Sequence, residues 1–99
     1  GTVENSVLFH SVIVEEGAKV SYSILMPGTV VKTGAVVEYT IVAENTVIGR
    51  NARVGAPPTA DNQEDWGIAV IAQNLKVGDN ATISPKAMIT KNVKGGEEK

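Results

Sequence analysis

The sequence predicts an all-β fold in which the backbone winds as a three-sided prism, with one short strand on each side. Three observations predict it: a long internal repeat of constant length, an aliphatic residue at the start of every five- or six-residue segment, and glycine or asparagine near the segment ends. The 99 residues therefore form a single domain of about five turns.

The repeat is gapless over the first half of the chain. Residues 3–19, 20–36 and 37–53 align as three blocks, each divided into segments of five, six and six. The aliphatic residues that begin the segments are Val3, Leu8, Val14, Val20, Leu25, Val31, Val37, Val42 and Ile48. The small or β-branched residues two positions before a segment start are Ser6, Val12, Ala18, Ser23, Thr29, Ala35, Thr40, Thr46 and Ala52. Because residues two apart on a strand share a face, we expect both sets to point inward.

Glycine or asparagine stands three residues after most segment starts. These corner residues are Gly17, Gly28, Gly34, Asn45 and Asn51. Both residue types tolerate a positive φ, so each predicts a sharp turn between two sides of the prism.

The stretch IGRNARVG, residues 48–55, resembles a phosphate-binding loop at first sight, because it combines two glycines with two arginines. The repeat explains it differently: Ile48 points inward, Asn51 turns the corner and Val54 begins the next side. A phosphate loop also needs a helix after it, and none is predicted here.

Residues 56–67, APPTADNQEDWG, break the period and predict a surface loop inserted at a corner. Further turns follow over residues 68–94, with the period resuming at Ile71 and with Asn74, Asn80 and Asn92 at corner positions. The tail, residues 95–99, has nothing to bury and is expected to be mobile.

Composition excludes several classes of function. The net charge of −2 and a pI near 5.3, without a Lys/Arg block, predict neither a nucleic-acid nor a membrane partner. The chain has no cysteine and one histidine, His10, so no zinc site is expected. No apolar run is long enough for a transmembrane helix, and a cytoplasmic location is expected. Gly1 in place of methionine suggests an excised piece of a longer protein.

The segments resemble the hexapeptide repeats of left-handed parallel β-helices, a family that implies the hand of the coil. Such helices occur in acyltransferases, carbonic-anhydrase-like proteins and nucleotidyltransferases. The repeated turns are similar to the C-terminal domain of bacterial ADP-glucose pyrophosphorylase (glucose-1-phosphate adenylyltransferase). The stretches that carry this resemblance are ENSVLF, SYSILMPGTVV, VGAPP, DWGIAVIAQNLKVGDNA and ITKNV.

That resemblance implies an enzyme that makes ADP-glucose from ATP and glucose 1-phosphate for glycogen synthesis. Its catalytic domain is N-terminal and uses Mg²⁺ and ATP, so these 99 residues would have no catalytic residue and no cofactor of their own. The β-helix would contribute to subunit assembly and to allosteric control by anions. Its partners would be its own N-terminal catalytic domain and other subunits, in a homo-oligomer.

Some members of that family place an effector-binding lysine shortly before the Gly-Ile that follows the loop. Here the matching residues are Glu64, Asp65, Trp66, Gly67 and Ile68. Acids occupy the lysine's place, so that effector site is not transferred to this chain.

One side of the predicted prism is apolar on the outside as well. Its outward residues are Val7, Phe9, Ile24, Met26, Ile41 and Ala43. Soluble monomers rarely expose a contiguous apolar patch of several hundred Å². We expect this side to be an interface, covered by the catalytic domain or by another copy of the chain, although exposed β-branched residues also simply suit strands.

Three further features are weaker candidates. His10 is either the general base of an acyltransferase or a solvated corner residue. Arg50 and Arg53 are either an anion contact or solvated side chains. Trp66 either packs on the prism or an absent domain, or stacks on a base or sugar.

The loop acids are Asp61, Glu64 and Asp65. Without apolar cover their pKa values would not rise, so a solvated loop is expected rather than an acid/base pair.

Three functions are compatible with these features of the sequence. The first is a regulatory and oligomerisation domain of glucose-1-phosphate adenylyltransferase. The alternatives are a fragment of a hexapeptide acyltransferase, which would bind coenzyme A and need His10, and the β-helix of another sugar-nucleotide pyrophosphorylase.

Overall fold

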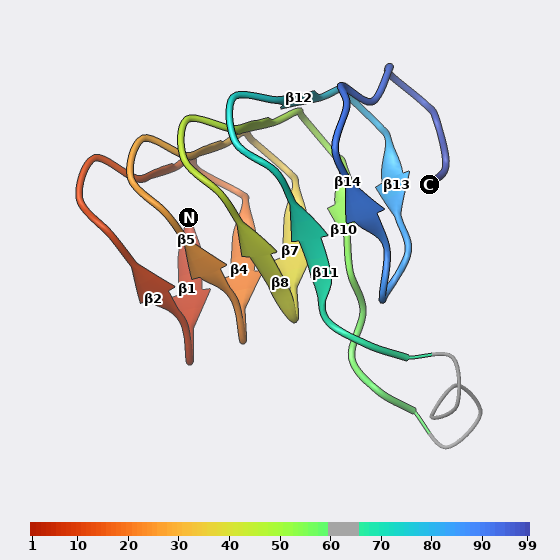
Figure 1. The fold of residues 1–99 in the computed structure, drawn as a ribbon. Helices are drawn as coiled ribbons and strands as arrows, with labels where there is room; N and C mark the ends of the chain where they lie inside the picture. The colour runs from red at the N-terminus through yellow and green to blue at the C-terminus, as the bar shows by residue number, and fades with distance from the viewer. Residues whose placement is uncertain (60–65) are drawn as a thin grey trace.

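A computed structural model describes residues 1–59 and 66–99, and within them fourteen strands and no helix are present. Consecutive strands pass from one side of a prism to the next, so that each side is a parallel sheet (Figure 1). Face A consists of β1 (Thr2–Glu4), β4 (Lys19–Ser21), β7 (Val36–Glu38), β10 (Arg53–Val54) and β13 (Thr82–Ile83). Face B consists of β2 (Val7–Leu8), β5 (Ile24–Leu25), β8 (Thr40–Val42), β11 (Ala69–Ile71) and β14 (Met88–Ile89). Face C consists of β3 (Ile13–Val14), β6 (Val30–Val31), β9 (Val47–Ile48) and β12 (Lys76–Val77).

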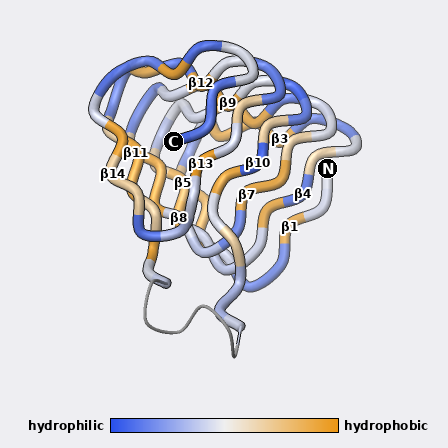
Figure 2. The backbone as a smooth tube through the Cα atoms, turned by 90° about the vertical axis from the view of Figure 1, so that its right-hand side faces the viewer, coloured by the Kyte–Doolittle hydropathy of each residue, from blue (hydrophilic) through white to orange (hydrophobic). Residues whose placement is uncertain are grey.

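The register between strands confirms the predicted repeat. Val3 pairs with Val20, and Val20 pairs with Val37, so equivalent residues of successive blocks lie side by side. The predicted all-β, three-sided helix of about five turns is therefore confirmed, and successive coils lie behind one another when the stack is viewed from its end (Figure 2).

The aliphatic residues that begin the segments form the core. Val20, Leu25 and Val31 of the second coil are fully buried, as are their equivalents in the third coil. Val3 and Leu8 of the first coil share this inward register but are 39% and 38% exposed. They are exposed because the first coil has a neighbour on one side only.

Most predicted corners are confirmed. Gly17, Gly28, Gly34, Asn45, Asn51, Asn74 and Asn80 all have a positive φ. Gly28 and Gly34 also leave room for the next coil, because a Cβ there would meet the side-chain oxygen of Asn45 and Asn51, respectively, and that side chain would have to move.

The prediction for Asn92 is wrong. Its φ is not positive, so it does not take the backbone conformation of the other predicted corners. The last turn is shorter than the others, because Val93 bridges to Val77 over less than one full repeat. The side-chain oxygen Oδ1 of Asn92 accepts a hydrogen bond from Lys76 N (2.9 Å). Asn92 therefore caps a strand instead of turning a corner.

The tail continues the stack and does not lie apart from it. Glu98 bridges to Thr82, whose N–H donates to Glu97 O (2.8 Å), and Lys99 N donates to Thr82 O (2.8 Å). The Glu97 carboxylate accepts the N–H of Lys94 (2.7 Å) and pairs with Lys99 Nζ (3.3 Å). These contacts, the backbone hydrogen bond first, lower the pKa of Glu97.

The corner between faces A and B carries a ladder of hydroxyl groups. Ser23 Oγ donates to Ser21 O (2.8 Å) in its own coil and accepts from Thr40 N (3.2 Å) in the next. Ser6 Oγ accepts from Ser23 N (3.1 Å) in the same way. The small inward residues were predicted for their size, and the structure adds that their hydroxyl groups satisfy buried backbone groups.

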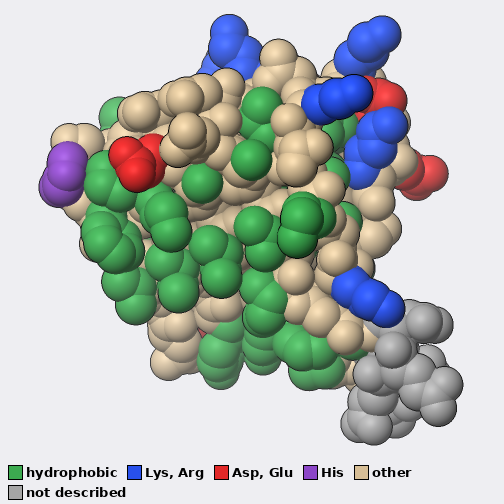
Figure 3. Space-filling model, viewed as in Figure 1, with side chains coloured by type: hydrophobic (Ala, Val, Ile, Leu, Met, Phe, Trp, Pro, Cys, Tyr) green, Lys and Arg blue, Asp and Glu red, His purple; other side chains and the backbone are tan. Residues whose placement is uncertain are grey.

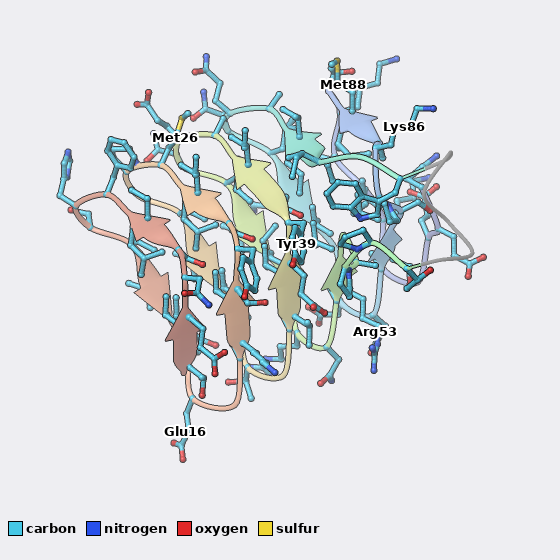
Figure 4. All side chains as sticks on the ribbon, turned by 90° about the horizontal axis from the view of Figure 1, so that it is seen from below. Glu16, Met26, Tyr39, Arg53, Lys86 and Met88 are labelled. Carbon is cyan, nitrogen blue, oxygen red and sulfur yellow. The ribbon has the colours of Figure 1, made fainter. Side chains whose placement is uncertain are left out.

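The same corner has a positive φ in every early coil, at Asn5 (47°), Tyr22 (48°) and Tyr39 (50°). The three-sided prism predicts a corner here, but the residues that turn it were not predicted, because tyrosine seldom takes such a φ. Tyr22 and Tyr39 stack with their ring centroids 4.8 Å apart, which matches the spacing of neighbouring strands. Figure 4 shows Tyr39 at this corner.

The inserted loop leaves the prism at this corner. Val54 pairs with Val37, one repeat before it, whereas Ile71 pairs with Val42, which lies much further back along the chain. The extra separation equals the length of the predicted insertion, 56–67.

Trp66 fastens the end of the loop to the prism. Its ring meets Tyr39 edge-on with centroids 5.4 Å apart, and its Nε1 donates to Ala56 O (2.6 Å). The prediction that Trp66 packs on the prism is confirmed.

Replacing Ser23 with alanine should leave Thr40 N–H without its acceptor and lower the free energy of unfolding by about 1–3 kcal/mol. Urea titration followed by circular dichroism measures this change. The control is Ser84→Ala, because Ser84 is exposed. Equal stability of the two variants would contradict the role of the ladder.

Tyr39→Asn should shift the fluorescence of Trp66, the only tryptophan, to longer wavelength, because its ring loses its partner and meets more water. Asparagine occupies the same corner at Asn5, so the backbone conformation is tolerated. Tyr22→Asn is the control, and its emission should stay close to that of the parent chain. An unshifted spectrum in Tyr39→Asn would show that the packing of Trp66 does not depend on this ring.

Candidate functional site

The outward side of face B is the most extensive candidate site. Val7, Ile24, Ile41, Val70 and Met88 occupy equivalent positions on its five strands. They form one row of aliphatic and thioether side chains from the first coil to the last (Figure 3).

A second row follows one step beyond the strands. Phe9, Met26 and Ala43 belong to it, and Ala72 continues it, because Ala43 N donates to Ile71 O and Ala72 N donates to Ile89 O. The extended stripe is Val7, Phe9, Ile24, Met26, Ile41, Ala43, Val70, Ala72 and Met88.

The predicted six residues therefore do lie together on one outward face. Val70, Ala72 and Met88 were not predicted to belong to this face, because the inserted loop hides the register that aligns them with the earlier coils. Val7 is 54% exposed, Phe9 48% and Met88 74%, and no residue of the stripe is charged. The surface is chemically suited to bind another apolar surface.

The arginine pair lies on another part of the prism. Arg50 is exposed at the corner after β9, and Arg53 is exposed on face A, where it points away from the prism (Figure 4). Neither guanidinium forms an ion pair with an acid of the described residues. The backbone N–H of Arg50 donates to Asp79 Oδ1 (2.8 Å), which places a carboxylate beside any anion bound there.

His10 is an exposed corner residue, at the position that Pro27 and Glu44 occupy in the next two coils. Its Nδ1 lies 3.4 Å from Ser11 Oγ, and no acid of the described residues contacts it. The described residues therefore offer the ring no carboxylate that would orient it as a general base.

The region after the inserted loop is described only in part. Asp61, Glu64 and Asp65 lie outside the described residues. Of the stretch that matches the family's effector position, Trp66 packs on Tyr39 as above, and Ile68 is 41% exposed.

Residues 1–59 and 66–99 hold no group of three His, Cys, Asp or Glu side chains that could bind a metal ion. Over the same ranges no helix is long and apolar enough to cross a bilayer.

Comparison with known proteins agrees with the fold. No curated protein sequence matches the chain. Among solved structures, the chain is similar to the acetyltransferase domain of PglB from Neisseria gonorrhoeae FA1090 in complex with acetyl coenzyme A. The TM-score is 0.60 at 21% sequence identity, and the alignment covers 95% of this chain and 50% of that one. The chain thus spans half the length of that domain, and at this identity the likeness concerns the fold alone.

The sequence also matches a protein family directly. The match is to the family described as GlmU-like, C-terminal hexapeptide, and it runs over residues 1–69, which include the three gapless repeats. Because this match covers more than half of the sequence, the chain belongs to the GlmU-like C-terminal hexapeptide family and is a left-handed β-helix of hexapeptide repeats.

Proposed function

We propose that the chain is an oligomerisation and regulatory β-helix domain, without catalysis of its own, from a glucose-1-phosphate adenylyltransferase. The reaction of the whole enzyme, ATP and glucose 1-phosphate to ADP-glucose, would belong to a separate N-terminal domain with its Mg²⁺. The β-helix would hold subunits together in the cytoplasm and transmit the binding of an anionic effector.

The extended stripe is the observation that carries this proposal. It runs over all five coils of face B and contains no charge. Removing apolar surface from water is favourable by roughly 25 cal/mol per Å², so covering this face stabilises an assembly. A stripe that a two-fold axis brings against itself forms a closed dimer, and we assign the face to contact with a second copy of the chain.

The chemistry of the polar candidates supports a binding role over a catalytic one. His10 has Ser11 as its polar neighbour and lacks an orienting acid among the described residues. General base catalysis needs a positioned group with a suitable pKa, and the exposed corner provides no such environment.

For regulation, Arg50 and Arg53 are the residues that we assign to an anion contact. Both are exposed, and neither is neutralised by an ion pair with a described acid. Asp79 lies beside the backbone of Arg50, so a bound phosphate would have to contact the guanidinium groups on their outer side.

A second candidate is a fragment of a hexapeptide-repeat acyltransferase. Two observations favour it: the family is described as GlmU-like, and the similar solved structure is an acetyltransferase domain bound to acetyl coenzyme A. In that case His10 would be the residue to accept a proton from the acceptor.

Replacing Ile24 and Met26 together with lysine should abolish dimers and leave a 10.4 kDa monomer, because an unpaired charge buried in the contact costs about 3–5 kcal/mol. Such a cost raises the Kd at least 100-fold. Light scattering after size-exclusion chromatography measures the mass. The matched control is Val30→Lys, which changes a partly exposed outward residue of the same coil on face C. Unchanged mass of the Ile24→Lys/Met26→Lys variant, with its β-sheet circular dichroism intact, would refute the assignment of face B.

Calorimetric titration of the chain with acetyl coenzyme A separates the two candidate functions. A regulatory domain should bind none at millimolar ligand, and His10→Ala should behave like the parent chain. Saturable binding, together with acetyl transfer to an amine that is lost in His10→Ala, would instead establish the acyltransferase.

A further inference from the structure

The corner between faces A and B carries aromatic side chains on the side of the prism. Tyr22 stacks on Tyr39 with ring centroids 4.8 Å apart and ring planes 10° apart, and Trp66 contacts Tyr39 edge-on. Tyr22 is nevertheless 51% exposed. Tyr39 lies in the next coil and covers one face of the Tyr22 ring, so the opposite face points toward the level of the first coil. Figure 4 looks onto this side of the molecule, with Tyr39 labelled.

The turn at this corner does not itself need an aromatic residue. Asn5 makes it in the first coil with a φ of 47°, against 48° at Tyr22 and 50° at Tyr39. A left-handed backbone costs an ordinary residue about 1–2 kcal/mol, whereas asparagine adopts it more readily. Tyr22 therefore keeps a half-exposed ring on a backbone that asparagine would adopt at lower cost. Such a combination of strain and exposed aromatic surface points to a role in recognition.

The ring of Tyr22 forms an open platform. Asn5 lies above it in the stack, because Tyr22 N donates to Glu4 O (3.2 Å) just as Tyr39 N donates to Ser21 O (3.1 Å) in the next coil. The side chain of Asn5 is shorter than a tyrosine ring and leaves the outer part of Tyr22 uncovered. A flat ring placed there would lie on Tyr22 as Tyr22 lies on Tyr39, one coil further along.

Unused polar groups border this platform. The side-chain amide of Asn5 is exposed and makes no hydrogen bond with the described residues. The carboxylate of Glu4, the residue before it, is exposed too and forms no ion pair with a described cation. An amide both donates and accepts hydrogen bonds, and a carboxylate accepts them. Together they match hydroxyl groups on the rim of a stacked ring.

The charge of the corner selects among flat ligands. The residues that directly flank it in the first three coils are Glu4, Ser6, Ser21, Ser23, Glu38 and Thr40, which include two acids and no cation. Carboxylates repel a phosphate group, so the corner disfavours a nucleotide. A pyranose sugar with equatorial hydroxyl groups is neutral, presents axial C–H bonds on its faces and carries hydroxyl groups around its rim. Its surface is complementary to an aromatic ring bordered by an amide and a carboxylate.

From these observations we infer that Tyr22, Asn5 and Glu4 form a binding site for a neutral pyranose sugar. One face of the sugar lies on the ring of Tyr22, which Tyr39 supports from the next coil. Hydroxyl groups of the sugar bond to the Asn5 amide and donate to the Glu4 carboxylate. The site uses no residue of the extended stripe, so it goes beyond the proposed function and does not depend on it.

Titration of the isotope-labelled 99-residue chain with methyl β-glucoside, followed by nuclear magnetic resonance, tests this site. This sugar is neutral and has all its ring hydroxyl groups equatorial. Saturable shifts should appear at the backbone amides of Glu4, Asn5 and Tyr22 and at the side-chain amide of Asn5. Ligand on the order of tens of millimolar is needed, because a single stacked ring with few hydrogen bonds binds weakly.

Variants separate the platform from its polar border. Tyr22→Asn keeps the turn, as Asn5 shows, and should weaken binding about tenfold by removing the ring. Tyr22→Phe keeps the ring and should bind within about twofold of the parent chain. Glu4→Gln should weaken binding roughly fivefold, because a hydrogen bond to a charged acceptor is lost. Glu16→Gln is the matched control, since Glu16 is an exposed acid at another corner, and it should bind like the parent chain.

Three results would overturn the inference. The first is the absence of saturable shifts in the folded parent chain, and the second is undiminished affinity in a folded Tyr22→Asn variant. The third is tighter binding of adenosine than of methyl β-glucoside at the same residues, which would indicate a site for a base. A chain that stays monomeric would refute the contact proposed for face B and leave the sugar titration unchanged, so the two failures are distinguishable.

Discussion

The hydrogen-bonded stacking of one coil on the next is the constraint on which the rest of this structure depends. Each coil contributes only a few inward aliphatic side chains, and its strands are two or three residues long. A strand pair of this length is not stable alone. Every coil therefore needs its neighbour to bury its inward side chains, such as Val20 and Leu25 in the second coil, and to pair its backbone N–H and C=O groups. The exposed Val3 and Leu8 show what happens to the same residue positions where that neighbour is missing.

Stacking also explains the chemistry of the corners. Neighbouring coils repeat each corner at the spacing of paired strands, so any side chain there lies directly above its equivalent. Asn45 fits above Gly28 because the glycine leaves room, Ser23 and Thr40 link through their hydroxyl groups, and Tyr22 lies on Tyr39. Contacts between equivalent residues thus offset the cost of a positive φ at tyrosine.

The fold produces surfaces more readily than clefts. A prism of parallel strands sends alternate residues inward, where they fill the core, and outward, where they line flat faces. Function therefore rests on which faces and ends carry apolar or charged residues. In this chain those are the extended stripe on face B and the exposed Arg50 and Arg53, whereas His10 has no acid of the described residues beside it.

The sequence alone determined the class of fold, the inward residues, most corners and the six outward residues of the stripe from Val7 to Ala43. These follow from local rules, since strand alternation and the tolerance of glycine and asparagine for a positive φ act within a few residues. Only the tertiary structure decided the rest. The alignment of Val70 and Met88 with the early stripe depends on register across an insertion, the stacking of Tyr39 on Tyr22 depends on a neighbouring coil, and the role of Asn92 as a cap depends on a shortened last turn. Each of these is a contact between residues far apart in the chain, and such contacts have no local signal in the sequence.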